Sequence, residues 1–339
     1  MKKILLIATG GTIASAEEGS GLAPALTGEQ LAAFVPGLET LCTFDVVQPM
    51  NIDSTNMRPA DWVRLAGVIE GAWDRYDGFV VLHGTDTMAY TAAALSYLVQ
   101  GDKPVVLTGS QLPMADPLTD GKLNVRQAFR FATDDRARGV CVTFAGKVIA
   151  GTRARKQRTV SFDAFGSVNL PLVACFRGDD VVMAPDFAAA EGIDSRAPLA
   201  APRPVRFFHE LNDRVCAVKL TPGMSPAFIA ALKHDFDAIV LEAFGIGGIP
   251  DFNEYREALF DWVNSGRVLV VTTQVPEEGL DLGVYEVGHA YAAHPGILKG
   301  GDMTPEALLV KTMWVLGRTD DPERVAELFY APVNFDRRF

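Results

Sequence analysis

Two short apolar runs of this chain end abruptly in turns built from glycine and threonine. One run, at residues 4–8, leads into Thr-Gly-Gly-Thr at 9–12, and another, at 79–82, leads into His-Gly-Thr-Asp-Thr at 83–87. Apolar runs of this length between turn residues are typical of buried strands. Because the carboxyl ends of parallel strands meet at one edge of a sheet, we expect the two turns to lie side by side and form a site.

Apolar runs and helical patterns alternate along most of the chain. Strands are predicted near 3–8, 43–48, 78–83, 104–108 and 139–144, and helices near 28–35, 60–75, 87–99 and 121–133. Further on, strands are predicted near 214–220, 237–242 and 267–273, and helices near 225–234, 252–264 and 304–316. This alternation predicts an α/β fold, with a larger N-terminal, mostly parallel sheet flanked by helices and a smaller C-terminal α/β domain.

The chain is longer than one hydrophobic core usually allows, since it has 339 residues. Between Ala184 and Val205 the alternation lapses into prolines among alanines and charged residues, a composition typical of a linker. We therefore predict an N-terminal domain over 1–190 that carries the catalytic residues, a linker over 191–210 and a C-terminal domain over 211–339.

Charge and composition exclude several kinds of partner. Lysine and arginine number 31 against 42 acidic residues, a net charge of −11, which opposes binding to nucleic acid and to anionic membranes. We find no apolar stretch of ~18 residues that could span a membrane. The apolar opening run is too short for a secretory leader, and the four cysteines are far apart, so we expect reduced thiols and a cytoplasmic location. His289 and His294 are five residues apart, so we predict no metal site, and no cofactor.

Every predicted turn at this sheet edge carries hydroxyl groups. The second strand is followed by Asp53-Ser54-Thr55-Asn56 and the fourth by Thr108-Gly109-Ser110-Gln111. Gly10, Gly11 and Gly84 allow close approach of the backbone to a ligand, and their N–H groups could hold an oxyanion. A hydroxyl needs a base to act as a nucleophile, and Lys156 is the only lysine in the basic cluster formed with Arg153, Arg155 and Arg158.

These patterns leave alternatives open. The turn at 9–12 could be an ordinary connection, an anion site or a catalytic loop. Asp86 or Thr87 could simply cap the helix that follows. His83, on an apolar strand, is interpreted as a buried core histidine rather than a base. The loop that contains Lys156 is by default a solvated surface turn.

Taken together, the two turns resemble the two signatures of the bacterial-type L-asparaginases. The matching stretches are residues 7–14 and 78–88, and the resemblance extends over 53–57, 108–113, 162–165 and 300–304, which is nearly the whole chain. The stretch from Leu82 to Ala92 and the missing leader make the cytoplasmic type I branch the closer match.

The resemblance implies a reaction, hydrolysis of the side-chain amide of L-asparagine to L-aspartate and ammonia, and roles for particular residues. Thr12 matches the threonine usually taken as the nucleophile, and Thr85, Asp86 and Lys156 match the proton-relay group. Ser54 matches the residue that holds the substrate α-carboxylate, and Asp86 also matches the group that binds the α-ammonium. The remaining expected substrate contacts are Gly11, Asp53, Thr55, Gly84, Thr85 and Ser110. Family members form homodimers or homotetramers, in which the second domain of a neighbour completes each site.

Two positions depart from the family pattern. Relatives usually carry a tyrosine in the loop after the first threonine, but residues 13–30 contain none, and Leu22 stands in the expected region. We hypothesise that Tyr285 or Glu286 supplies the missing polar contact, or that turnover is weaker. Relatives also often have an asparagine at the position of Gly248, which bears on substrate preference.

Three other functions compete with an L-asparaginase. One is a broad-specificity glutaminase-asparaginase. A second is the ammonia-supplying component of a tRNA-dependent amidotransferase, which usually carries an additional N-terminal domain, whereas the signature here begins at residue 4. The third is a non-catalytic asparagine-binding homologue that kept the pocket and lost turnover.

Overall fold

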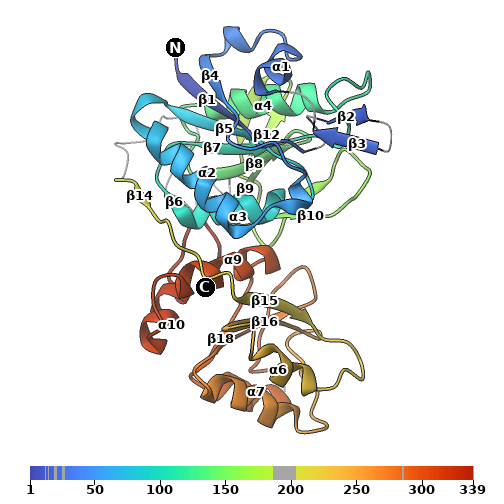
Figure 1. Cartoon of the computed structure of the whole chain (residues 1–339), viewed down its shortest axis with the longest axis vertical. Helices are drawn as coiled ribbons and strands as arrows, with labels where there is room; N and C mark the ends of the chain where they lie inside the picture. The colour runs from blue at the N-terminus through green and yellow to red at the C-terminus, as the bar shows by residue number, and fades with distance from the viewer. Residues whose placement is uncertain are drawn as a thin grey trace. The chain divides into compact units, whose positions relative to one another are not determined.

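The computed structural model describes residues 1–11, 13, 15–18, 21–24, 27–185, 204–284 and 286–338. The chain forms two compact units, Met1–His209 and Glu210–Phe339 (Figure 1). Much of the predicted linker lies outside the described residues, so its limits stay a prediction. Within the described ranges, no helix is both long and apolar enough to cross a bilayer.

An eight-stranded sheet forms the centre of the first unit, with the order β13-β12-β9-β8-β7-β5-β1-β4. Five of its strands are parallel: β1 (Lys3–Ala8), β4 (Thr43–Val47), β5 (Gly78–Leu82), β7 (Val105–Thr108) and β8 (Val140–Phe144). These are the five strands predicted from apolar runs. Because β1 lies between β4 and β5, the turns after these strands meet at one sheet edge.

Helices cover both faces of this sheet. Figure 1 shows α1 (Gly28–Ala33) and α4 (Gly121–Ala132) on one face and α2 (Pro59–Ala72) and α3 (Met88–Leu98) on the other. Helix α2 begins with a proline in its first turn, and Asp61 accepts a hydrogen bond from the Arg58 N–H, as the Pro-Ala-Asp pattern favours. The predicted α/β arrangement is confirmed for this unit.

The alternation of strands and helices fails after β8. The chain reverses instead at Ala145 and Gly146, whose φ angles are 48° and 79°, and forms the antiparallel strand β9 (Lys147–Ala150). Two positive φ angles in a two-residue loop match the right-handed twist of a hairpin. Strands β12 (Ala174–Arg177) and β13 (Asp180–Met183) extend the sheet, also antiparallel. None of the three strands was predicted.

A smaller hairpin, β10 (Ala154–Lys156) with β11 (Phe165–Ser167), follows β9. Its register places Lys156 opposite Phe165. Two further short pairs, β2 (Ser15–Glu18) with β3 (Gly21–Pro24) and β6 (Val99–Gln100) with β14 (Arg206–Phe207), lie outside the main sheet. The β10–β11 hairpin matters most for the site, because it carries the predicted lysine.

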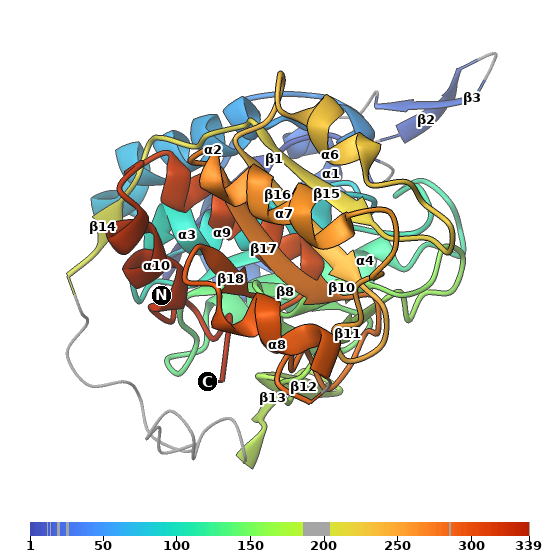
Figure 2. The same cartoon turned by 90° about the horizontal axis from the view of Figure 1, so that it is seen from below.

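A four-stranded parallel sheet forms the second unit. Its strands are β15 (Val215–Lys219), β16 (Ala238–Ala243), β17 (Val268–Thr273) and β18 (Ile297–Lys299). Its helices are α6 (Ala227–Leu232), α7 (Tyr255–Asn264), α8 (Glu286–Ala293), α9 (Pro305–Leu316) and α10 (Pro322–Tyr330). Figures 1 and 2 show α6 and α7 on one face of this sheet and α9 on the other. Strand β18 and helices α8 and α10 were not predicted.

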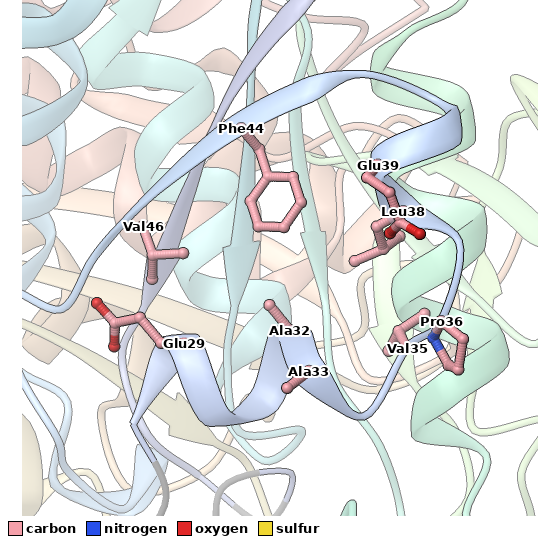
Figure 3. A pocket seen from close by; sticks show the side chains of 9 residues that line it. All are labelled: Glu29, Ala32, Ala33, Val35, Pro36, Leu38, Glu39, Phe44 and Val46. Carbon is pink, nitrogen blue, oxygen red and sulfur yellow. The ribbon is translucent and has the colours of Figure 1, made fainter.

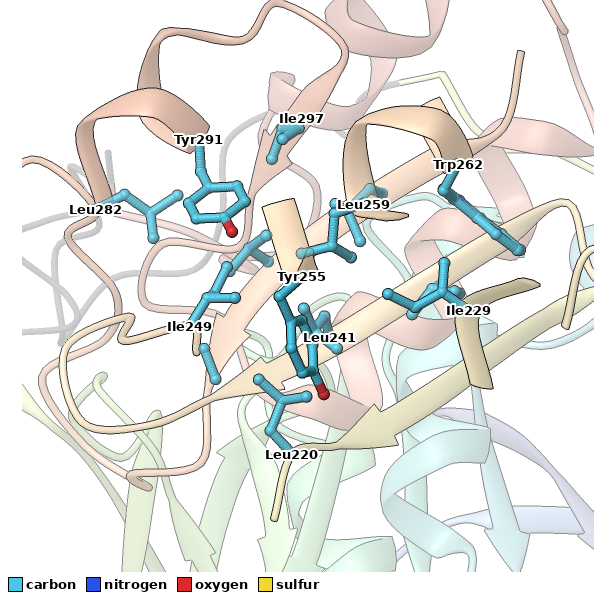
Figure 4. Packing of buried hydrophobic residues seen from close by; sticks show 14 residues of the cluster. Leu220, Ile229, Leu241, Ile249, Tyr255, Leu259, Trp262, Leu282, Tyr291 and Ile297 are labelled. Atoms are coloured by element: carbon cyan, nitrogen blue, oxygen red, sulfur yellow. The ribbon is translucent and has the colours of Figure 1, made fainter. Parts of the chain in front are cut away.

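The core of the second unit lies between its sheet and the helices α6, α7 and α8. Figure 4 shows Leu241 of β16, Tyr255 and Trp262 of α7, and Tyr291 of α8 in this cluster. The Trp262 indole N–H donates to the backbone oxygen of Val268 at 3.0 Å, so this large side chain is buried with its polar atom satisfied. The smaller C-terminal α/β domain is thus confirmed as a layered unit with its own core.

Candidate active site

The turns after β1 and β5 touch through their glycines. A Cβ atom placed on Gly11 would lie 2.4 Å from the Cα of Gly84, and Gly11 has a φ of 83°, so only glycine fits there without strain. The two turns therefore lie side by side, as predicted, and their main-chain atoms are in direct contact.

The turn after β4 joins the same edge. Ile52 bridges to Gly10, because the Gly11 N–H donates to the Ile52 oxygen at 3.0 Å and the Ile52 N–H donates to the Thr9 oxygen at 2.9 Å. This pairing places Ser54 beside Gly84, where a Cβ on the glycine would lie 2.5 Å from the Ser54 hydroxyl oxygen. Ser54 is buried, with 3% of its surface exposed.

Asp53 and Thr55 form a local cap next to Ser54. The Asp53 carboxylate accepts hydrogen bonds from the backbone N–H and from the hydroxyl of Thr55, both at 2.9 Å. This is the usual way in which an aspartate begins a short helical turn, here at Ser54–Asn56. Both residues flank Ser54, and these hydrogen bonds join them to each other.

Lys156 reaches the turn after β5 from the β10–β11 hairpin. Its ammonium group donates to the Thr85 hydroxyl at 2.8 Å and to the Asp86 carboxylate at 2.6 Å. The Thr85 residue is buried, and the side chains of Lys156 and Asp86 are 19% and 57% exposed. A buried hydroxyl is thus connected to a cation, which itself contacts a carboxylate that water can reach.

Thr85 has a second partner that the sequence did not single out. Its hydroxyl donates to the side-chain oxygen of Gln111 at 3.2 Å, and the Gln111 amide N–H donates to the Ser161 backbone oxygen at 3.2 Å. The signal in the sequence was the position of Gln111 directly after a strand end, beside the predicted Ser110. Ser110 is buried, and its hydroxyl donates to the backbone oxygen of Leu112.

His83 is a buried structural histidine, as its apolar strand predicted. Its Nδ1 lies 2.7 Å from the Gly84 backbone oxygen and its Nε2 lies 2.8 Å from the Thr91 hydroxyl. Thr91 also accepts a hydrogen bond from the Trp62 indole at 2.9 Å. Burial lowers the pKa of His83 to about 4, because the charged ring would lose its hydration.

Thr87 does not cap helix α3 through its side chain. Its hydroxyl instead donates to the Ser54 backbone oxygen at 2.8 Å, which ties the turn after β5 to the turn after β4. The capping interpretation is therefore wrong for Thr87. Asp86 contacts Lys156.

The basic cluster is only partly a surface turn. Arg153 is fully buried, and Lys156 points into the site, so the default interpretation of a solvated loop is wrong for these two residues. Arg158 is exposed and donates to the Asp163 backbone oxygen at 2.6 Å, while Lys147 donates to the Asp163 carboxylate. The hydrogen bond from Lys147 holds the pKa of Asp163 below its usual value.

Three of the predicted contributors lie outside the described part of the chain. They are Thr12, Tyr285 and the side chain of Glu286; the side chain of Leu22 is also outside it. Gly248 is described, and a Cβ there would meet the Phe244 backbone oxygen at 3.3 Å, so a larger residue needs only a small adjustment. Across the described residues, no group of three or more histidine, cysteine or acidic side chains is arranged to hold a metal ion.

Two hollows lie apart from these residues. One, of about 300 Å³, lies beside edge strand β4, and Figure 3 shows its mostly apolar lining with Glu29 and Glu39 at the rim. The other, of about 280 Å³, lies in the second unit beyond the ends of β16 and β17 and is lined by Gly245, Ile246, Leu280 and several acidic residues. Neither includes a predicted site residue of the first unit.

Glycine main-chain atoms, a lysine-bonded threonine and a carboxylate thus meet at the carboxyl edge of a parallel sheet. A hydroxyl in contact with a group that can exchange its proton is what a hydrolase of the acyl-transfer type needs.

Family models match both units. The model described as "Asparaginase, N-terminal" matches residues 3–188, and "Glutaminase/Asparaginase C-terminal domain" matches residues 214–329. The chain therefore belongs to the asparaginase family.

Individual relatives agree with this assignment. The chain is 38% identical to the L-asparaginase of Thermococcus kodakarensis over 96% of both chains, and 34% identical to "L-asparaginase 1" of Escherichia coli over 81% of this chain and 78% of that protein. It is also 33% identical to a component of the glutamyl-tRNA(Gln) amidotransferase of Pyrococcus abyssi, covering 97% of this chain and 75% of the relative.

Solved structures agree as well. The T. kodakarensis L-asparaginase structure has a TM-score of 0.88 at 36% identity and covers 99% of both chains. A structure described as a probable cytoplasmic L-asparaginase, from Campylobacter jejuni, has a TM-score of 0.81 at 26% identity and covers 98% of this chain and all of that one.

Proposed function

We propose that this protein hydrolyses the side-chain amide of L-asparagine to L-aspartate and ammonia. The observation that carries the proposal is the contact of Lys156 with both Thr85 and Asp86 at the edge where the glycine turns meet. Membership of the asparaginase family and the relatives called L-asparaginase support the choice of substrate.

The proposed site fits a zwitterionic amino acid. Asp86 would bind the α-ammonium group, because its carboxylate is partly exposed and lies beside the buried Thr85. Ser54 would hold the α-carboxylate with its hydroxyl, next to the main chain of Gly11 and Gly84. Asp53, Thr55 and Ser110 would complete the pocket wall. Opposite charges at the two ends of the ligand favour a single orientation.

The proposed chemistry is acyl transfer to a threonine. The Thr12 hydroxyl would attack the amide carbon, and its proton would pass through the Thr85 hydroxyl to a neutral Lys156. Other N–H groups of the glycine turns would stabilise the oxyanion, because the Gly11 N–H donates to the Ile52 oxygen. The C–N bond then breaks, the leaving ammonia takes a proton from the relay, and water hydrolyses the ester to release L-aspartate and free Thr12. We expect neither a metal nor a cofactor to take part.

A broad-specificity glutaminase-asparaginase is the second candidate. Gly248 favours it, since a Cβ at this position would meet the Phe244 backbone oxygen at 3.3 Å and the Phe244 Cβ at 3.8 Å, and the glycine leaves this space empty. The family resemblance assigns this position to the substrate pocket, where the missing side chain would leave room for one more methylene group. Hydrolysis of L-glutamine at a rate comparable with that of L-asparagine would favour this candidate.

We also propose that the protein is a cytoplasmic homodimer or homotetramer. Exposed apolar side chains lie near the strand ends of each unit, Val160 and Phe162 in the first and Ile246 and Val275 in the second, and an interface between subunits would bury them. The four cysteines are free thiols, which suits a reducing compartment. Light scattering during gel filtration measures the oligomer, and a monomer at micromolar concentration would contradict the assembly.

An ammonia-release assay over L-asparagine, D-asparagine and L-glutamine tests the reaction. We expect L-asparagine to be the preferred substrate, and Thr12→Ala to lower kcat by about 100-fold or more. The activity of Thr12→Ala would refute the role of Thr12 if it equalled that of the wild type. Binding of L-asparagine without ammonia release would instead favour the non-catalytic homologue.

A further inference from the structure

Gln111 contacts the proposed relay directly, yet none of the roles assigned above includes it. Its side-chain oxygen lies 3.2 Å from the Thr85 hydroxyl oxygen, and its amide nitrogen lies 3.2 Å from the Ser161 backbone oxygen. Gln111 therefore joins the turn after β5 to the loop between β10 and β11. Lys156, the last residue of β10, joins the same hairpin to the turn after β5 through its bond to Thr85.

The main chain of Gln111 is held in place by the residue that precedes helix α4. The Asp120 carboxylate accepts a hydrogen bond from the Gln111 backbone N–H at 3.0 Å and one from the Leu112 N–H at 3.2 Å. The same carboxylate accepts from the Asn124 amide at 3.0 Å. These hydrogen bonds fix the backbone from which the Gln111 side chain extends.

The orientation of the Gln111 amide follows from its partners. A backbone oxygen can only accept, so the amide NH₂ must face Ser161 and the amide oxygen must face Thr85. The Thr85 hydroxyl hydrogen then points at Gln111, since that oxygen cannot donate. One lone pair of the Thr85 oxygen takes the hydrogen bond from the Lys156 ammonium, and the second is left for a reacting group.

This arrangement, in which Lys156 donates to Thr85 and Thr85 donates to Gln111, exists only while Lys156 is charged. When Lys156 is neutral and Thr85 donates to it, the Thr85 hydrogen turns away and the bond to Gln111 is lost. The charged state is also the one that follows transfer of the nucleophile proton through Thr85 to Lys156. Gln111 therefore stabilises the relay after proton transfer and not before it. An interaction that is stronger after the transfer than before it lowers the barrier to that proton transfer.

We propose that Gln111 is a positioning residue for Thr85. It holds the Thr85 hydroxyl hydrogen away from Lys156, which is the orientation that the hydroxyl has once Lys156 carries the transferred proton. The inference rests on the proposed function, because the relay is part of it. The charged groups that face this relay are Lys156 and Asp86, with Asp120 at the Gln111 backbone. Lys147, Arg158 and Asp163 hold the loop that carries Ser161.

Gln111→Met tests the proposal, because methionine keeps the length of the side chain and removes the acceptor. We expect kcat for L-asparagine at alkaline pH to fall about 3- to 10-fold, the size of one neutral hydrogen bond, while KM changes by less than about twofold. The rising limb of the plot of kcat against pH should move to lower pH in Gln111→Met. At low pH the kcat values of the variant and the wild type should therefore approach each other. A merely structural role would lower the whole profile by one factor and leave its midpoint in place.

Gln100→Met is the matched control. Gln100 also uses both side-chain atoms, accepting from Arg206 at 2.8 Å and donating to the Tyr97 backbone oxygen at 3.2 Å, but it lies outside the site. Its profile should match that of the wild type. A Gln111→Met profile that also matches the wild type would overturn the proposal.

Neutron diffraction of the wild-type protein tests the orientation of the Thr85 hydroxyl without any reaction. Deuterium on the Thr85 hydroxyl should point at the Gln111 oxygen, and deuterium directed at Lys156 would overturn the inference. If the wild type releases no ammonia from L-asparagine, the proposed function fails, and the position of this deuterium still decides the orienting role of Gln111.

Discussion

The ammonium group of Lys156 lies 2.8 Å from the hydroxyl of Thr85, a residue 71 positions earlier in the chain. Thr85 follows a parallel strand of the central sheet, whereas Lys156 belongs to an antiparallel hairpin outside it. The site therefore combines two different strand arrangements. The parallel strands supply glycines and hydroxyls, and the hairpin supplies the cation.

Replacing Lys156 should remove activity. Lys156→Met takes away the only proton acceptor proposed for Thr85, so we expect kcat to fall by about 100-fold or more. Ammonia release measures the effect, and circular dichroism checks the fold. Lys233→Met is a matched control, because Lys233 also contacts an aspartate, Asp261, at 2.6 Å and lies in the second unit. Equal activities of the two variants would exclude Lys156 from the mechanism.

Removing the Thr85 hydroxyl should be as severe. Thr85→Val keeps the shape of the side chain and deletes the group that lies between Lys156 and the reacting atoms, so kcat should fall by about 100-fold or more. Thr312→Val is the control, since Thr312 is a buried threonine that donates only to the Leu308 backbone oxygen at 2.8 Å. The prediction is wrong if kcat of Thr85→Val stays within about tenfold of the wild type.

The contact between Gly11 and Gly84 predicts a particular sensitivity. Gly11→Ala would bring a Cβ to 2.4 Å from the Gly84 Cα at a φ of 83°, whereas Gly146→Ala has a similar φ of 79° and nothing within 4 Å. Gly146→Ala should cost about 1 kcal/mol of unfolding free energy, the strain of the backbone alone. We expect Gly11→Ala to cost more and to abolish turnover. Urea denaturation compares the two variants, and equal losses would contradict a steric contact.

Stability should fall in acid because His83 is buried without charge. Its pKa falls from 6.5 in the unfolded chain to about 4 in the folded protein, so the unfolded chain binds the extra proton between these values. The contribution of neutral His83 to the free energy of unfolding is complete above pH 6.5 and is lost as the pH falls towards 4, a change of about 3 kcal/mol. His83→Gln should lose less stability than the wild type between about pH 7 and about pH 4.5. Parallel curves of unfolding free energy against pH would refute this assignment.

A buried ion pair in the second unit should be costly to break. Lys311 and Asp336 are both fully buried, lie 2.5 Å apart and connect helix α9 to the C-terminal segment. Lys311→Met removes the cation that faces the buried Asp336 carboxylate and should destabilise the protein by about 3–5 kcal/mol. The pair of Lys233 and Asp261, whose side chains are 25% and 72% exposed, is the comparison, and Lys233→Met should cost about 1 kcal/mol or less. Thermal unfolding of the full chain measures both, and similar losses would show that burial is unimportant here.

The sequence predicted the parallel part of the fold because each of its strands is a continuous apolar run. Strands β9, β12 and β13 could not be predicted in the same way. The reversal at Ala145 and Gly146 places a non-glycine residue at a positive φ, and alanine gives little warning of such a turn. An alternation of strands and helices therefore describes this unit only as far as β8.

The site was predictable to the extent that it follows strand ends. Gly11, Ser54 and Gly84 come together because β1 pairs with both β4 and β5, which the alternation already favoured. The approach of Lys156 to Thr85 depends on the β10–β11 hairpin; the basic cluster had made Lys156 a candidate base, and the resemblance to a family had paired it with Thr85. Gln111 was missed because its amide faces Thr85 only when the Ser161 oxygen holds its other side.

The floor of the candidate site is made of main-chain atoms at Gly11 and Gly84, and this has an evolutionary consequence. Because neither position tolerates a side chain, natural variation cannot reshape the deepest part of the pocket one residue at a time. Descendants of such a protein can acquire new substrates only by changing the surrounding segments, such as the loop that carries Gln111. The chemistry of the site is thereby inherited unchanged while its selectivity can drift.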